Sequence, residues 1–248
     1  SEISWQQENE RESLQINAGT LRVRPHNDGW RFETSELDIG ANQNQWPSFG
    51  GKIDYNNGRI TTQWRDFPLA LLSDVAPLLP FEQTKIVEQL LLKGSVSDLY
   101  VQYHNPEDYF FTTSVRDLSW QHYNGIPGVQ NLSLTLVGDQ SAAKLSVQGN
   151  EDYIMTGELF TRAIPYKQLT INLDFLKQAQ GWTLESDTTQ LDNDELTFAA
   201  EFSLNLFEQS ELSLYAEMQG PEVLKARHYF PRGYMPQGTI DYLNRSLR

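Results

Sequence analysis

The segment from Leu196 to Met218 constrains the fold most strongly, because its apolar residues occupy alternate positions. The alternation runs to Leu206 and resumes at Leu212 after a short polar stretch. A two-residue period is typical of β-strands with one apolar and one polar face. At roughly 3.3 Å per residue, the run over 196–206 predicts a strand about 36 Å long. A long sheet with one apolar face needs an apolar cover, and the identity of that cover is the functional question.

The same alternation fills most of the remaining chain. Apolar residues alternate in short runs over 14–64 and 96–184, and turn-forming residues at 17–19, 25–29 and 40–42 separate the first of these runs. The dipeptide Asn57-Gly58 suits a type I′ hairpin turn. Strands and tight turns in this order indicate an antiparallel meander.

Two segments change to helical spacing. Apolar residues recur at intervals of three and four over 68–93, with a break at Pro80, and again over 221–247, with a break from Pro231 to Pro236. We therefore predict four parts: the C-terminal part of a first β-module at 1–67, a helical connector at 68–93, a second β-module at 94–220, and a closing or connecting helical segment at 221–248.

The two halves of the chain repeat. The segment from Gly29 to Thr34 matches that from Gly181 to Ser186, at an offset of 152 residues (181 − 29), and Pro80 matches Pro231 at nearly the same offset. Repetition at an almost constant offset predicts a modular, stacked architecture. In this register the first copy is truncated on its N-terminal side.

Composition limits the partners and the chemistry. The net charge of −14, from 33 acidic and 19 basic residues, opposes attraction to nucleic acid or to an anionic membrane surface. The absence of cysteine removes disulfides and thiolate metal sites. No apolar run approaches the roughly eighteen residues of a membrane span. Because the sequence begins with neither Met nor a secretion signal, we expect a piece of a longer protein.

The sequence offers no catalytic or metal-binding motif. The four histidines, His26, His104, His122 and His228, lack metal-site spacing, and the acidic stretch 192–195 lacks the Gly and closing Glu of a calcium loop. We expect no catalytic residues, no metal and no cofactor, and therefore no enzyme activity. The strand-borne tryptophans, Trp30, Trp64, Trp120 and Trp182, are expected to pack in the apolar face of the sheet, whereas a sugar-stacking platform would need them on the polar face.

Several short motifs resemble one known family. They are Lys93-Gly94 followed by Ser-Val-Ser-Asp-Leu99, Leu118-Ser-Trp120 before Gly125-Ile-Pro-Gly128, Leu132-Ser-Leu-Thr-Leu136, and Tyr229-Phe-Pro-Arg-Gly-Tyr-Met-Pro236 before Ile240-Asp-Tyr-Leu243. Together they resemble the central region of the AsmA-like YhdP family of Gram-negative envelope proteins. Tyr242 stands where many relatives are expected to carry Trp, which is a packing change.

This resemblance implies a mainly β fold, in which a long curved antiparallel sheet forms repeated, taco-like β-groove modules with a few short helices between them and at the C-terminus. It further implies a periplasmic segment, anchored in the inner membrane by an N-terminal helix outside this sequence. The apolar groove of such a protein carries phospholipid towards the outer membrane in outer-membrane biogenesis, with other envelope proteins as possible partners and no nucleic acid. The matched motifs themselves look like fold signatures.

The alternating apolar residues of the second half are the candidate lipid-binding residues. They are Leu132, Leu134, Leu136, Leu145, Val147, Leu169, Ile171, Leu173, Phe175, Leu196, Phe198, Phe202, Leu204, Leu206, Leu212, Leu214 and Met218. A carrier must shield acyl chains whose exposure to water costs about 0.8 kcal/mol per methylene. The alternatives are a filled sandwich that acts as a non-transporting envelope scaffold, a carbohydrate-binding β-sandwich, and a hydrolase that uses surface carboxylates.

Overall fold

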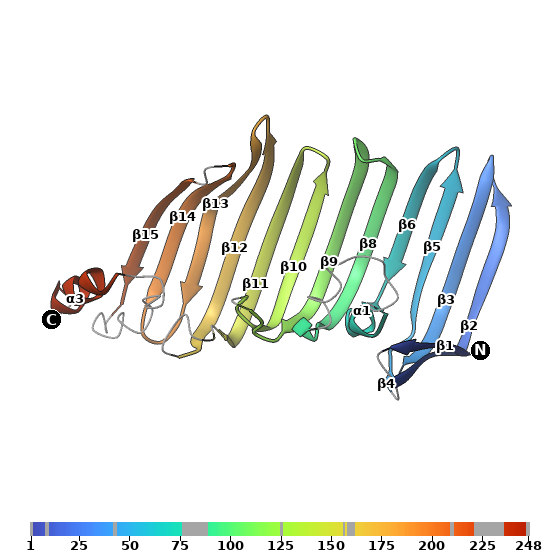
Figure 1. The fold of residues 1–248 in the computed structure, drawn as a ribbon, viewed down its shortest axis with the longest axis horizontal. Coiled ribbons are helices and arrows are strands. Elements are labelled where there is room, and N and C mark those ends of the chain that lie inside the picture. Colours follow the sequence, from blue (N-terminus) through green and yellow to red (C-terminus); the bar gives the residue numbers. More distant parts are fainter. Residues whose placement is uncertain are drawn as a thin grey trace. The chain divides into compact units, whose positions relative to one another are not determined.

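The computed structural model describes residues 2–7, 10–41, 44–75, 89–124, 126–155, 157, 162–208, 211–220 and 236–246. Within them the chain forms two compact units, one of residues 1–118 and 135–141 and the other of residues 119–134 and 142–248. Antiparallel strands make up most of both units, and the helices are few and short (Figure 1). The predicted mainly β, antiparallel fold class is confirmed.

The first unit is an open sheet in which consecutive strands pair. Its strands are β1 (Glu2–Gln7), β2 (Glu10–His26), β3 (Gly29–Ala41), β4 (Asn44–Gln45), β5 (Phe49–Asn56), β6 (Arg59–Arg65), β7 (Phe67–Pro68), β8 (Lys93–Asn105) and β9 (Asp108–Trp120). They are hydrogen-bonded in the order β1-β2-β3-β5-β6-β8-β9, with β4 on β3 and β7 on β8. Long strands joined by tight turns follow from the alternating pattern.

The turn predicted at 17–19 is wrong, because β2 runs through these residues. The pairing of β2 with β3 shifts between Ile16 and Ala18 and again between Ala18 and Thr20, and Gly19 has a φ of 131°. Such register shifts are β-bulges, which bend a strand without ending it. The turn predicted at 57–58 is confirmed, since Asn57 and Gly58 both have the positive φ of a type I′ hairpin.

The second unit is also an open antiparallel sheet. Its strands are β11 (Ala142–Ile154), β12 (Ile164–Gln178), β13 (Gly181–Asp192), β14 (Thr197–Leu206) and β15 (Glu211–Gln219), paired in chain order. Strand β10 (Val129–Asp139) contributes residues to both units, and the last two residues of β9, Ser119 and Trp120, also belong to the second unit. The alternation over 197–219 forms the predicted strand pair, but Leu196 itself lies just before β14, in a turn that Asn193 closes with its side-chain oxygen.

The internal repeat has a structural counterpart. In the first unit Val23 pairs with Phe32, and in the second unit Phe175 pairs with Leu184, at the same offset of 152 residues (175 − 23). Both β3 and β13 begin at the repeated glycine, Gly29 or Gly181. The repeated sequence therefore forms the same hairpin with the same register in each unit.

The predicted helical segments are described in part. Helix α1 (Ala70–Val75) starts after Pro68, and α3 (Gln237–Ser246) forms the predicted last helix, with Ile240 buried. The predicted helical residues at 76–88 and 221–235 lie outside the described part of the chain. Strands β6 and β8, on either side of the predicted connector, pair directly with each other. The module boundaries at 67/68, 93/94 and 220/221 stay a prediction.

Candidate functional site

The second unit presents one apolar face, which we call the second-unit apolar face. Partners in an antiparallel register project to the same side of the sheet, so the register defines rows of side chains across the strands. One row is Leu169, Leu191, Phe198 and Met218, and another is Phe175, Leu184, Leu204 and Leu212. Between them stand Val147 with Ile171, Leu145 with Leu173, and Phe202 with Leu214.

The structure brings most of the sequence-predicted residues together on this face. Strand β11 carries Leu145 and Val147, β12 carries Leu169, Ile171, Leu173 and Phe175, β14 carries Phe198, Phe202, Leu204 and Leu206, and β15 carries Leu212, Leu214 and Met218. Strand β10 carries Leu132 and Leu134 within the second unit, whereas Leu136 of the same strand belongs to the first unit. Leu196 is buried next to its turn. Whether these residues contact a lipid stays a prediction.

Two apolar residues of this face were not among the predicted lipid-binding residues. Leu184 and Leu191 supply the β13 members of the two rows. The pairing of β13 with β14 shifts between Ser186 and Thr189. Before this shift the even-numbered residues of β13 face the apolar side of the sheet, and after it the odd-numbered residues do. A strict two-residue period therefore fails along β13, although both residues belong to one face.

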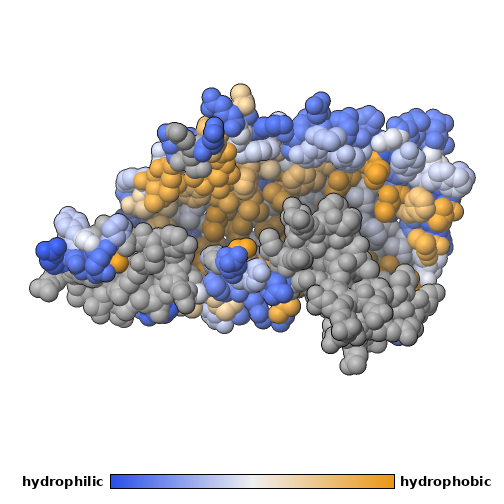
Figure 2. Space-filling model, viewed as in Figure 1, coloured by the Kyte–Doolittle hydropathy of each residue, from blue (hydrophilic) through white to orange (hydrophobic). Residues whose placement is uncertain are grey.

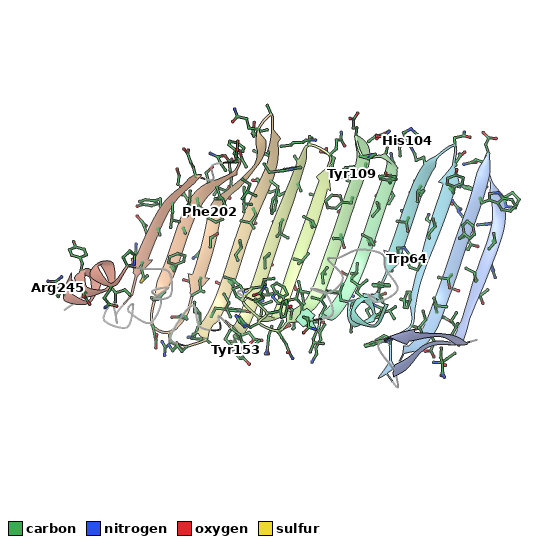
Figure 3. The ribbon with its side chains drawn as sticks, in the orientation of Figure 1. Trp64, His104, Tyr109, Tyr153, Phe202 and Arg245 are labelled. Atoms are coloured by element: carbon green, nitrogen blue, oxygen red, sulfur yellow. The ribbon has the colours of Figure 1, made fainter. Side chains whose placement is uncertain are left out.

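Exposure varies strongly across the second-unit apolar face. Leu169 and Leu132 are each 4% exposed, whereas Leu212 and Leu214 on β15 are each 61% exposed. Hydrophobic side chains gather over the region of β13 to β15 in the space-filling view (Figure 2), and Phe202 lies along β14 (Figure 3). A filled core would bury every row, but here large apolar side chains remain in contact with solvent.

At the buried end of the second-unit apolar face, neighbouring side chains pack directly on the backbone of Gly149. A Cβ atom at this glycine would lie 2.7 Å from Cδ2 of Leu132 and 2.8 Å from Cε2 of Tyr166, so both side chains press against the bare backbone. The Tyr166 hydroxyl donates a hydrogen bond of 3.0 Å to the Gln130 carbonyl. Burial, with a smaller effect of Asp152, raises the pKa of Tyr166 to about 12. This tyrosine is therefore a neutral packing residue near neutral pH.

The first unit has an apolar face of its own, the first-unit apolar face. Its central row is Val23, Phe32, Ile53, Thr62 and Val101, and the row nearest the hairpin turns is Pro25, Trp30, Tyr55, Ile60 and Tyr103. Leu21 is 70% exposed, and Val23 and Trp30 are about half exposed. None of these residues was predicted to bind lipid, because their runs are shorter and contain more Thr and Gly.

One end of the first-unit apolar face is covered by α1 and its neighbours. Leu71 of α1 is buried with Ile39 and Phe49, and Leu37, Trp46, Trp64 and Phe67 pack around them. The rings of Phe49 and Phe67 meet edge to face with centroids 5.1 Å apart. Figure 3 shows Trp64 towards the α1 end of the strands and His104 at the opposite, hairpin end of β8. The cover therefore reaches only part of the face.

The opposite face of the first unit is polar and charged. The Arg31 guanidinium donates hydrogen bonds to both carboxylate oxygens of Asp54, at 2.5 Å and 2.8 Å. Nε2 of His26 lies 2.9 Å from Nη2 of the same guanidinium. The hydrogen bond from Arg31 lowers the pKa of Asp54, and this effect outweighs the desolvation that would raise it. Asp54 is therefore charged at neutral pH, and the pair fixes β3 to β5 on this side.

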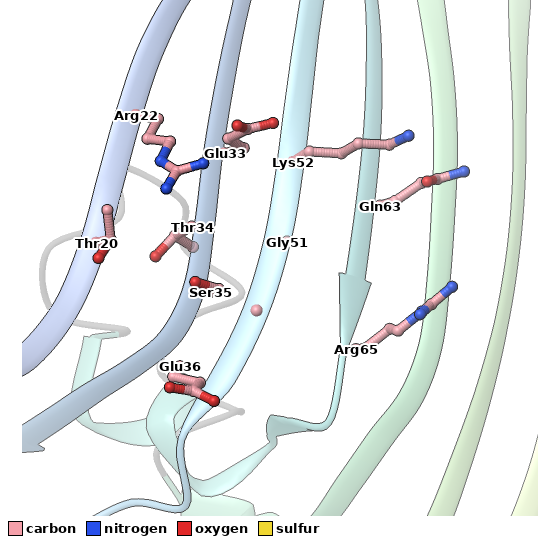
Figure 4. A pocket seen from close by; sticks show the side chains of 11 residues that line it. Thr20, Arg22, Glu33, Thr34, Ser35, Glu36, Gly51, Lys52, Gln63 and Arg65 are labelled. Carbon is pink, nitrogen blue, oxygen red and sulfur yellow. The ribbon is translucent and has the colours of Figure 1, made fainter.

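A hollow of about 540 Å³ lies on this polar face. Arg22, Glu33, Lys52, Gln63 and Arg65 are among its lining residues (Figure 4). Figure 4 shows these side chains projecting from neighbouring strands without converging on one point. The side chains that line the hollow are polar or charged, so it does not offer the continuous apolar surface that an acyl chain needs.

Histidines and carboxylates are the candidate metal-binding groups in the described part of the chain. Among the described residues, no group of three or more His, Asp or Glu side chains is placed to hold a metal ion. His26 and His104 line a second polar hollow together with Asp54 and Arg59. His228 lies outside the described residues. The absence of an enzymatic site stays a prediction.

Comparison with known proteins assigns the family. The family model described as "YhdP protein" matches residues 1–248. The chain belongs to the YhdP family. A relative from Escherichia coli (strain K12), named "Intermembrane phospholipid transporter YhdP", is 20% identical over 264 residues. That alignment covers 99% of this chain and 21% of the relative, so the chain spans about a fifth of the relative's length.

Two further findings accompany the YhdP assignment. No solved structure matches the chain significantly. Among the described residues, no helix combines the length and the apolar character that crossing a bilayer requires. The resemblance predicted from the short motifs is thereby confirmed at the level of the family.

The tryptophans agree with the packing interpretation. Trp30 and Trp64 stand in the rows of the first-unit apolar face, and Trp182 pairs with Leu206 on the second-unit apolar face. Trp120 donates a hydrogen bond of 2.7 Å to the Pro127 carbonyl. A sugar platform on the polar face, as the alternative requires, is not formed by Trp30, Trp64 or Trp182.

Proposed function

We propose that this chain is a segment of a phospholipid carrier, in which acyl chains lie on the apolar face of each unit. The observation that supports the proposal most directly is the contrast between faces: solvent-exposed Leu212 and Leu214 share one side of β15, and exposed Leu21 and Val23 share one side of β2. The opposite side of the first-unit sheet carries ion pairs such as that between Arg31 of β3 and Asp54 of β5.

Acyl chains are the ligand that suits such a face. Each methylene removed from water contributes about 0.8 kcal/mol, so a chain of many methylenes gains binding free energy along a row of Leu and Phe side chains without needing a shaped pocket. Polar headgroups remain in water at the hairpin turns. The net charge of −14 adds no general attraction for anionic headgroups, so we expect the apolar contact to dominate.

The printed name of the E. coli relative, an intermembrane phospholipid transporter, supports phospholipid as the cargo. By the same likeness we propose that the segment lies in the periplasm, that it belongs to a protein anchored in the inner membrane, and that it moves lipid towards the outer membrane without catalysing a reaction. Other envelope proteins are proposed partners of the whole protein.

Native mass spectrometry of the chain purified from a Gram-negative host tests the proposal. We expect mass adducts that dissociate as phospholipid, and we expect extraction of the sample to yield phospholipid in fixed proportion to protein. A chain that folds, carries no phospholipid and takes none from phosphatidylcholine vesicles supports the scaffold alternative. Retention of an oligosaccharide in place of lipid supports the carbohydrate-binding alternative.

A further inference from the structure

The row of the first-unit apolar face nearest the hairpin turns differs from the rows beside it. Trp30 pairs with Tyr55, Tyr55 pairs with Ile60, and Ile60 pairs with Tyr103, so three aromatic side chains with polar tips stand in one line. They are 50%, 48% and 38% exposed in that order. The turns at 27–28, 57–58 and 106–107 follow within a few residues. We call this line the aromatic rim.

The polar tips of the aromatic rim have no protein partner. Within the described residues, Nε1 of Trp30 and the hydroxyls of Tyr55 and Tyr103 form no hydrogen bond. Aromatic residues elsewhere behave differently, since Trp120 donates to the Pro127 carbonyl and Tyr166 to the Gln130 carbonyl. The rim thus offers free donors above an apolar surface.

The next row along the strands offers no comparable donor. Its members are Val23, Phe32, Ile53, Thr62 and Val101, and the Thr62 hydroxyl already donates to the Lys52 carbonyl at 3.2 Å. The face therefore changes, over one row, from apolar side chains to aromatic side chains with unsatisfied N–H and O–H groups. Trp and Tyr are enriched at the boundary between hydrocarbon and headgroups in membranes for this reason.

The internal repeat places the same kind of side chain at the second unit. Trp182 stands at the position equivalent to Trp30, at an offset of 152 (182 − 30), and its indole N–H, too, has no hydrogen-bond partner within the described part of the chain. Lys177 pairs with Trp182, where Pro25 pairs with Trp30. A free cation next to a tryptophan suits a phosphate group.

We propose that the aromatic rim fixes the depth of a bound phospholipid by donating hydrogen bonds to its ester and phosphate oxygens. This inference rests on the proposed function, because it assumes that acyl chains occupy the apolar face below the rim. The lipid is then oriented with its headgroup at the hairpin ends of β3, β5 and β8. The rim selects for lipids with ester or phosphate acceptors over plain hydrocarbon.

The test compares binding of phosphatidylcholine and of a long-chain alkane by the chain and by two variants. The double variant Tyr55→Phe with Tyr103→Phe keeps both rings and removes two donors. Tyr100→Phe is the matched control, because Tyr100 pairs with Gln63 on the polar face and its hydroxyl bonds to Gln102 at 3.3 Å. Each lost hydrogen bond weakens binding about fivefold.

We expect the double variant to bind phosphatidylcholine about 25-fold more weakly than the unaltered chain, to bind alkane equally well, and to melt at the same temperature. Tyr100→Phe should change neither ligand's affinity. Equal phosphatidylcholine affinity of the double variant and the unaltered chain overturns the rim while leaving the carrier function intact, as does an equal loss for both ligands. If the unaltered chain binds neither ligand, the proposed function fails as well.

Discussion

Replacing Leu214 with Asp separates an open lipid face from a filled core. Full burial of a leucine side chain contributes about 1.5–3 kcal/mol to stability. Leu214 is 61% exposed, so only about 0.6–1.2 kcal/mol of that contribution is available to lose in the free protein. We expect Leu214→Asp to fold, with a melting temperature lowered by a few degrees.

Lipid binding should respond far more strongly than folding. Covering the exposed 61% of Leu214 with an acyl chain contributes about 0.9–1.8 kcal/mol, and a carboxylate in its place must also be desolvated. The variant is therefore expected to lose at least about tenfold in affinity for phosphatidylcholine. Circular dichroism follows folding, and lipid retained after incubation with vesicles, measured by mass spectrometry, follows binding.

The matched control for Leu214→Asp is Ser213→Asp, which adds the same charge to the other side of β15. Ser213 pairs with Ser203, whereas Leu214 pairs with Phe202. The control should retain lipid as the unaltered chain does. Equal lipid retention by both variants, or global unfolding of Leu214→Asp alone, refutes the reasoning.

Two further predictions concern stability. Gly149→Ala should destabilise the chain by about 1–3 kcal/mol in urea titration, because the added methyl group overlaps Leu132 and Tyr166. An unchanged midpoint of the urea transition would show that Leu132 and Tyr166 can move aside without a loss of stability. Asp54→Asn should be less stable than the unaltered chain at neutral pH, since Arg31 lowers the pKa of Asp54 and the ionised form is favoured in the folded state. That difference should shrink as pH falls through the lowered pKa, and a difference that grows on acidification contradicts this role.

Sequence alternation predicted the strands and their faces well where the period was unbroken. Along β14 and β15 the pattern from Phe198 to Met218 identified one apolar face, and register confirms it. The pattern could not predict bulges, because one extra residue inverts the parity of every later side chain. For this reason it missed Leu191 after the shift in β13 and predicted a turn around Gly19.

The solvent exposure of individual side chains was the feature that the sequence predicted least well. Leu169 and Leu214 look alike in an alternating strand, yet the first is buried and the second is mostly exposed. Leu169 pairs with Gly149, the glycine against which Leu132 and Tyr166 pack, and strand pairing brings Leu132 and Gly149 to it from other strands. The aromatic rim likewise emerges only from register, since Trp30, Tyr55 and Tyr103 are well separated in sequence and become neighbours through strand pairing.

Site-specific photo-crosslinking along β15 tests the central claim most directly. A photoreactive benzoylphenylalanine is placed at each position from 211 to 219 in turn, in the chain expressed in a Gram-negative host, and crosslinked phospholipid is measured after irradiation. The account predicts lipid adducts at 212, 214, 216 and 218 and little or none at 211, 213, 215, 217 and 219, because alternate side chains of a strand face opposite sides. Equal yields at consecutive positions, or adducts confined to the odd-numbered positions, would contradict it.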